Sequence, residues 1–219
     1  MTLTHHPDDA TLMSFAAGSL PEALSAVVST HLMVCPECRK RVTSMESIGA
    51  ALMQAMDSDR APIARPSPSA LQAFEATDHL QHRPRARPSA SALAPSEAVS
   101  HVLGTPLSDV KWRRLGLGVW HCPIPLQSGR GDLRLLKVQR GLAMPEHGHG
   151  GSELTLIIEG AYRDEIGTFS AGDVADLDDT VEHRPVADPE TGCICLIAME
   201  EKIRFKGMIG RLLQPFSGL

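Results

Sequence analysis

Apolar residues follow two different patterns along this chain, one after the other. Up to about residue 80 they recur three or four positions apart, as along one face of a helix, in DDATLMSFAAG, PEALSAVVSTHLMV, PECRKRVTSMESIGAALMQAM and SALQAFEATDHL. From Val99 onward they alternate with polar residues in short runs such as DLRLLKVQRG, ELTLIIEGAYRDEIG and TGCICLIAMEEKIRF, as in β sandwiches and barrels. The pattern predicts a helical part followed by a β-rich part.

The ends of the first helices carry their own signals. Asp8 or Asp9 is placed to cap the first helix, Gly18 to end it, and Pro21 stands where a second helix would begin. The third segment presents a long apolar series at Val42, Met45, Ile48, Leu52, Met53 and Met56. We expect these three helices to share a small core.

The fourth helical segment, around Leu71 and Phe74, stands alone between Pro-rich stretches. It has too few neighbours in sequence to bury its apolar face within a three-helix unit, so it suits a partner-binding surface. The alternative is that it folds back onto the other helices.

Residues 81–96 (QHRPRARPSASALAPS) are rich in Pro, Arg, Ser and Ala and offer little to bury, which is typical of a flexible linker. The predicted organisation is therefore a helical domain over 1–80, a linker over 81–96 and a β-rich domain over 97–219. Three arginines in the linker could contact nucleic acid or an acidic partner, although such residues are more often simply solvated.

A metal-type motif, H-x3-C-x2-C, lies in the helical part at His31, Cys35 and Cys38. Residues 31 and 35 are four apart and lie close together on a helix, while Pro36 can open the next helix and let the two cysteines converge. These are three ligands of a tetrahedral zinc site, and a metal is a usual supplement to a core this small.

The fourth ligand of that zinc would come from His5 or His6, the nearby candidates at the N-terminus. Two other interpretations of the cysteines remain: a C-x-x-C redox pair, which normally occurs in a βαβ context, or unrelated core thiols. The helical surroundings favour zinc.

A second metal motif lies in the β-rich part, where GLAMPEHGHGGSELTLIIEG fits G-x5-H-x-H-x3-E-x6-G. His147 and His149 are two apart on a strand and so point to one face, and Glu153 returns after a Gly-rich turn. His183, on a later strand, is the candidate fourth ligand. Two or three imidazoles and a carboxylate suit zinc, iron, manganese or nickel; histidines in a polar hairpin are the plainer alternative.

Composition narrows the functional classes. No apolar run approaches the ~20 residues of a membrane span, and the polar N-terminus is unlike a signal peptide, so we expect a cytoplasmic protein. Five cysteines, two of them in a metal spacing, favour a reducing compartment; Cys193 and Cys195 would face one side of a strand as buried thiols. With a net charge of −5, the chain lacks the excess of basic residues that general nucleic-acid binding requires.

The second motif resembles that of the cupin family. Gly172 and His183 fit the frame G-x5-P-x-G-x2-H-x3-N of the family's downstream motif, while Asp178, Thr180 and Ala187 replace its Pro, Gly and Asn. The resemblance implies a small double-stranded β-barrel that binds a divalent metal, with zinc the first expectation, through His147, His149, Glu153 and His183. The expected fold class is thus multidomain α + β, with a zinc-stabilised helical domain before a cupin barrel.

Taken over nearly its full length, the chain resembles the ChrR-type zinc-binding anti-sigma factors, through HHPDDATLMSFAAGSL, the H-x3-C-x2-C motif, the linker and the cupin motif. The resemblance implies a 1:1 complex between the helical domain and an extracytoplasmic-function sigma factor, released when the cupin senses oxidants such as singlet oxygen. It also implies His6, in preference to His5, as the fourth zinc ligand. We expect no catalysis, no membrane partner and no direct nucleic-acid binding.

Two other functions remain open. A cupin metal with an open coordination position can support dioxygenase or isomerase chemistry, which would make the chain an enzyme with an accessory zinc domain. Alternatively, the zinc helices could bind DNA and the cupin a small molecule, although the N-terminal part has no basic recognition helix.

Overall fold

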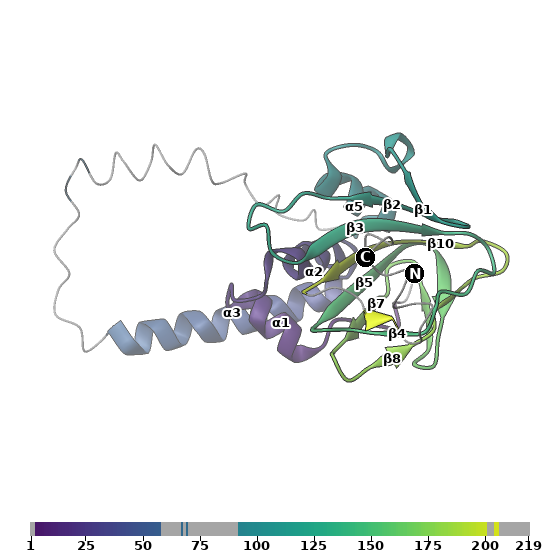
Figure 1. Ribbon diagram of the computed structural model, residues 1–219. Helices are drawn as coiled ribbons and strands as arrows, with labels where there is room; N and C mark the ends of the chain where they lie inside the picture. Colours follow the sequence, from purple (N-terminus) through teal and green to yellow (C-terminus); the bar gives the residue numbers. More distant parts are fainter. Residues whose placement is uncertain (1–2, 58–66, 68, 70–91, 201–203, 206–219) are drawn as a thin grey trace.

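The computed structural model describes residues 3–57, 67, 69, 92–200 and 204–205. Its helices are α1 (Asp9–Ala16), α2 (Glu22–Val34), α3 (Pro36–Asp57) and α5 (Pro95–Leu103), with a 3-10 turn at Leu107–Asp109 (Figure 1). The strands are β1 (Arg113–Gly116), β2 (Val119–Pro123), β3 (Asp132–Val138), β4 (His147–Gly148), β5 (Glu153–Arg163), β6 (Thr168–Ser170), β7 (Val174–Leu177), β8 (Glu182–His183), β9 (Val186–Ala187), β10 (Cys193–Met199) and β11 (Arg204–Phe205).

Two antiparallel sheets make up the β-rich part. The larger has the order β1-β2-β3-β10-β5-β6, with β7 and β9 also pairing with β5, and the smaller has the order β11-β4-β8. This confirms the predicted order of a helical region followed by an antiparallel β domain.

Local chemistry explains where the helices begin. The Asp8 carboxylate accepts a hydrogen bond from the Thr11 N–H at 2.6 Å, which confirms the predicted cap of α1. Pro21 precedes α2 as its N-cap, so the helix begins at Glu22, one residue later than predicted. Pro36 opens α3 directly after Cys35, whose extended backbone separates α2 from α3.

Strand alternation divides the buried side chains of the sheet between two faces. On β5, Leu154 and Leu156 pack towards the helices, whereas Glu153 and Thr155 belong to the interior of the β domain. On β10, the thiols of Cys193 and Cys195 line that same interior, as the two-residue spacing predicts. One face of the sheet is therefore covered by the helices, and the other carries the carboxylate of Glu153 and the two thiols.

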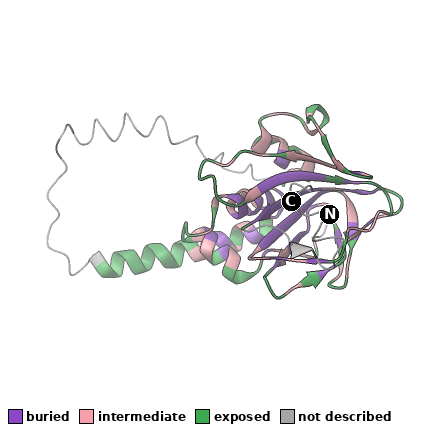
Figure 2. Cartoon of the chain, viewed as in Figure 1, coloured by how far each residue is buried: buried purple, intermediate pink, exposed green. Residues whose placement is uncertain are grey.

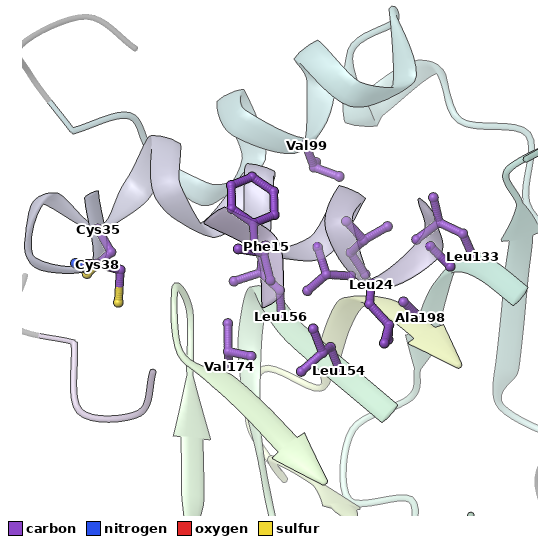
Figure 3. Close-up of a cluster of buried hydrophobic side chains, with 14 of the residues drawn as sticks. Phe15, Leu24, Cys35, Cys38, Val99, Leu133, Leu154, Leu156, Val174 and Ala198 are labelled. Carbon is purple, nitrogen blue, oxygen red and sulfur yellow. Dashed lines mark hydrogen bonds between the residues drawn. The ribbon is translucent and has the colours of Figure 1, made fainter. Parts of the chain in front are cut away.

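The helices and the sheet share one hydrophobic core instead of forming separate ones. Leu24 of α2 packs in a cluster with Leu154 and Ala198 of the sheet and with Val99 of α5 (Figure 3). The helical spacing of the apolar residues predicted that α1, α2 and α3 form a core of their own. That expectation was wrong because α2 is apolar over more than one face and needs the sheet to cover it.

The end of the expected linker also differs from the prediction, because Pro95 and Ser96 already belong to α5. This helix packs on α2 and on the sheet, so it joins the two parts of the fold. Residues 81–91 lie outside the described residues, as do Leu71 and Phe74 of the fourth helical segment.

The second half of α3 extends away from the body of the molecule, and its residues are exposed (Figure 2). Ile48, Leu52, Met53 and Met56 are 56%, 61%, 71% and 74% exposed. The prediction that the apolar series of α3 lies in the core therefore holds for Val42, which is buried, and is wrong for these four. Helical spacing identifies an apolar face but not whether the chain folds over it.

Within the described residues, no helix combines the length and the apolar character that crossing a membrane requires.

Candidate metal centres

Four side chains from three segments converge beside α2. The ligand-type atoms of His6, His31, Cys35 and Cys38 all lie within 4.8 Å of one another. His31 occupies the last turn of α2, Cys35 caps that helix and Cys38 lies in the first turn of α3. His6 comes from the extended segment before α1. The helix junction predicted from Pro36 does bring the two cysteines together.

The geometry of this cluster fits a zinc ion. His6 Nδ1 lies 3.5 Å from Cys35 Sγ and 3.4 Å from Cys38 Sγ, and the Cys38 N–H donates a hydrogen bond to Cys35 Sγ at 3.4 Å. His31 is fully buried, and its Nε2 has no hydrogen-bond partner within the described part of the chain. A buried unpartnered imidazole nitrogen beside two thiols and a second imidazole is the donor set of a tetrahedral zinc site.

His5 lies outside the cluster. Its ring lies tilted against Phe169, with the ring centroids 4.3 Å apart, and its Nδ1 lies 3.7 Å from the Asp173 carboxylate. Of the two N-terminal histidines, the structure therefore places His6 with the cysteines and His5 against the β domain.

The two thiols are electrostatically coupled. A hydrogen bond from Cys38 lowers the pKa of Cys35, and the same contact, together with burial, raises the pKa of Cys38. One thiolate is thus already favoured in the pair, and a bound zinc ion would supply the charge that favours the second.

A second cluster lies inside the β domain, where His147, His149 and His183 bring ring nitrogens within 4.8 Å of one another. His147 and His183 are register partners on β4 and β8, and their Nε2 atoms are 3.1 Å apart. All three imidazoles are at least 95% buried. Adjacent strands therefore bring together residues that are 36 positions apart in the chain.

Contacts to the outer ring nitrogens orient two of these imidazoles. His183 Nδ1 lies 2.8 Å from the buried Asp164 carboxylate, and His147 Nδ1 lies 2.8 Å from the Pro145 carbonyl. If each Nδ1 carries the proton, each Nε2 is left facing its neighbour as a metal ligand. Burial works to raise the pKa of Asp164, but hydrogen bonds from His183 and backbone N–H groups outweigh it, so the pKa is lowered.

Glu153 lies beside this group and outside its 4.8 Å limit. Its Oε2 is 3.0 Å from His149 Nδ1, and the Thr155 hydroxyl donates to Oε1 at 3.1 Å. Burial opposes ionisation of this carboxyl, yet the neighbouring histidines keep the pKa of Glu153 lowered. His149 Nε2 has no hydrogen-bond partner within the described part of the chain, so three imidazoles with an adjacent carboxylate fit a divalent metal.

An apolar cavity of about 60 Å³ adjoins two of the three histidines, His147 and His183. It is lined by His147, Glu153 and His183 and by Met144, Tyr162, Cys193 and Cys195. The two thiols are free and 4% exposed, as expected of buried thiols.

Three residues that organise these centres were not predicted to do so from the sequence. Asp164, Gly172 and Asp173 lie in polar turns of the β domain, where acidic and glycine residues are ordinary. Gly172 had one signal in the sequence, its fit to the cupin frame. Asp164 and Asp173 belong to no ligand motif.

The fold and the two centres define a class of protein in which a helical Cys/His cluster is joined to a cupin-like barrel with its own histidine cluster. A family model described as ChrR Cupin-like domain matches residues 101–202. The Anti-sigma-E factor ChrR of Cereibacter sphaeroides is 42% identical over 216 residues, 99% of each chain. The chain therefore belongs to the ChrR family of anti-sigma factors, and the family resemblance in the sequence is confirmed.

A solved structure agrees with this assignment. In the crystal structure of Rhodobacter sphaeroides SigE in complex with the anti-sigma ChrR, one chain matches with a TM-score of 0.71 and 41% identity. The match covers 90% of this chain and 99% of that chain, so it includes the helical part as well as the barrel.

Proposed function

We propose that this protein is an anti-sigma factor that binds an extracytoplasmic-function sigma factor 1:1 in the cytoplasm and releases it under oxidative stress such as singlet oxygen. The observation that carries the proposal is the 42% identity, over 99% of both chains, to a protein named as an anti-sigma factor. The matching complex of SigE with ChrR supports a sigma factor as partner.

Each part of the chain has a role in this proposal. The helical domain over 1–80 holds zinc through His6, His31, Cys35 and Cys38 and binds the sigma factor. The barrel over 97–219 holds a divalent metal, with zinc the first choice, through His147, His149, Glu153 and His183, and it responds to the oxidant. The ion in the helical domain is structural, since four protein ligands close its coordination shell.

The exposed half of α3 supplies a surface for the partner. Ile48, Leu52, Met53 and Met56 form an apolar stripe on a helix that extends into solvent (Figure 2). An amphipathic helix of this kind is a common binding element, because its apolar face is buried only in the complex.

The proposal is tested by measuring the affinity of the full chain for the sigma factor of its own organism that is most similar to SigE. Burying a large apolar side chain contributes about 1.5 to 3 kcal/mol, so Leu52→Asp should weaken binding by roughly 10- to 100-fold. The matched control is Leu117→Asp, at a residue 83% exposed in the turn between β1 and β2, which should bind as the unmodified chain does.

This assay tests the anti-sigma function and the α3 binding surface separately. If the unmodified chain does not bind the sigma factor, the anti-sigma function is wrong. If the chain binds but Leu52→Asp binds equally well, the function stands and the α3 surface is not its binding face.

A further inference from the structure

His31 is held in place by the barrel. Its Nδ1 lies 3.0 Å from the Gly172 carbonyl oxygen, which belongs to the turn between β6 and β7 and is 141 residues away in the chain. When Nδ1–H donates to this carbonyl, Nε2 is left as the ring nitrogen that a metal can use. One of the two imidazoles of the zinc cluster thus takes its tautomer and ring orientation from the barrel.

His6 depends on the same turn through the residues before it. The buried Asp173 carboxylate accepts hydrogen bonds from the backbone N–H groups of Thr4 at 2.8 Å and His5 at 3.1 Å, and from the Thr4 hydroxyl at 3.2 Å. The His5 carbonyl in turn accepts a hydrogen bond from the Val174 N–H at 3.1 Å. The peptide that leads into His6 is therefore fixed on both sides to the start of β7.

The turn itself is anchored firmly in the barrel. The Gly172 N–H donates to the Ile157 carbonyl at 2.8 Å, and the Ile157 N–H donates to the Asp173 carbonyl at 3.0 Å. Gly172 has φ +94°, and a Cβ there would lie 2.5 Å from Leu3 Cδ2, so the N-terminal segment packs directly on it. Ile157 belongs to β5, the strand that begins with Glu153 of the barrel centre.

We propose that the β6–β7 turn is part of the zinc site, with Gly172 and Asp173 as positioning residues that hold His31 and His6 for the ion. The zinc affinity of the helical part is then set in part by the barrel, and a displacement of β5 or β7 reaches the zinc through one turn. This inference rests on the proposed zinc ligands and is independent of sigma-factor binding.

The test is the zinc affinity of full-length Asp173→Ala and Asp173→Asn, measured by competition with a chromophoric chelator in the absence of any partner. Cobalt(II) substitution separates the two centres, because of the two clusters among the described residues the helical one includes cysteines and the barrel one consists of histidines, so thiolate-to-cobalt charge-transfer absorption reports on the helical cluster. Removing a residue that orients a metal ligand costs about 10- to 100-fold in affinity, and we expect that loss here.

Asp188→Ala is the matched control. The Asp188 carboxylate also holds a barrel turn, accepting from the N–H groups of Glu190 at 2.9 Å and Thr191 at 2.8 Å and from the Thr191 hydroxyl at 2.9 Å, so its hydrogen bonds within the described residues stay inside that turn. Its zinc affinity should stay within about twofold of the unmodified chain.

Each outcome decides the matter. Weaker zinc binding in both Asp173 variants with an unchanged Asp188 variant supports the proposal; equal losses in all three mean a general effect of barrel stability and overturn it. Unchanged affinity in the Asp173 variants also overturns it. If Asp173→Ala does not fold, the milder Asn variant decides by the same criterion. If the unmodified chain gives no thiolate-to-cobalt band, the zinc assignment itself is wrong.

Discussion

The core shared by α2 and the sheet predicts that the helical part and the barrel unfold together. Leu24 is 2% exposed and packs in one cluster with Leu154 and Ala198 (Figure 3). Replacing a buried leucine by alanine costs about 2 to 5 kcal/mol, depending on how far the cavity collapses. In a chain of this size each kcal/mol lowers Tm by about 2 to 4 °C, so Leu24→Ala should lower Tm by about 4 to 20 °C.

Two spectroscopic signals follow the two parts separately. Far-UV circular dichroism reports mainly on the helices, whereas the chain's two tryptophans, Trp112 and Trp120, lie in the β-rich part. In Leu24→Ala both signals should shift together to the lower temperature. Leu117→Ala, at an 83% exposed position, should change the stability by less than about 0.5 kcal/mol.

One result would refute this reasoning. If Leu24→Ala lost its helical signal at a lower temperature while the tryptophan transition stayed in place, the helices and the barrel would be independent folding units, despite their shared cluster.

Three further predictions concern the metal centres and pH. Cys38→Ser should bind zinc more than about 100-fold more weakly, since removing a mere orienting residue already costs about 10- to 100-fold, and its thiolate-to-cobalt band should be weaker, because Cys35 is left as one thiolate ligand; tight zinc binding by this variant would contradict the proposed ligand set. Asp164→Asn should weaken metal binding in the barrel by about 10- to 100-fold, with a smaller loss than His183→Ala and an unchanged cobalt–thiolate band, because its carboxylate only orients His183. Burial works to raise the pKa of Asp173, but its hydrogen bonds outweigh that effect and leave the pKa lowered, so the carboxylate stabilises the fold above its ordinary pKa of 3.8, and this stability is lost as the pH falls through the folded value. Asp173→Asn should therefore show a weaker loss of Tm between pH 5 and pH 3 than the unmodified chain, and identical slopes would contradict this assignment.

Much of the local structure could be predicted from the sequence because it depends on short-range chemistry. Asp8 caps α1, Pro36 opens α3, and period-two alternation places Cys193 and Cys195 on one face of β10. The spacing of His31, Cys35 and Cys38 likewise reflects a helix followed directly by another, and the structure brings them together.

The arrangement of the parts could not be predicted in the same way. The apolar spacing of α2 shows that Leu24 needs a partner, but the partner could equally be another helix or a sheet. The same spacing on α3 includes Leu52, which the fold leaves exposed. Asp164 and Asp173 act through contacts with residues distant in sequence, and in the sequence they look like any acidic turn residue.

The hydrogen bond between Thr4 and Asp173 spans 169 residues, and it bears on how the chain folds as it is synthesised. The helices emerge from the ribosome long before β5 and β10, so the apolar face of α2 stays uncovered until these strands have been synthesised. Contacts this distant in sequence slow folding, because a long loop must close before they form. A chaperone, an early-bound zinc ion or a partner protein would therefore have the most influence on the yield of native protein while only the N-terminal segment has been synthesised.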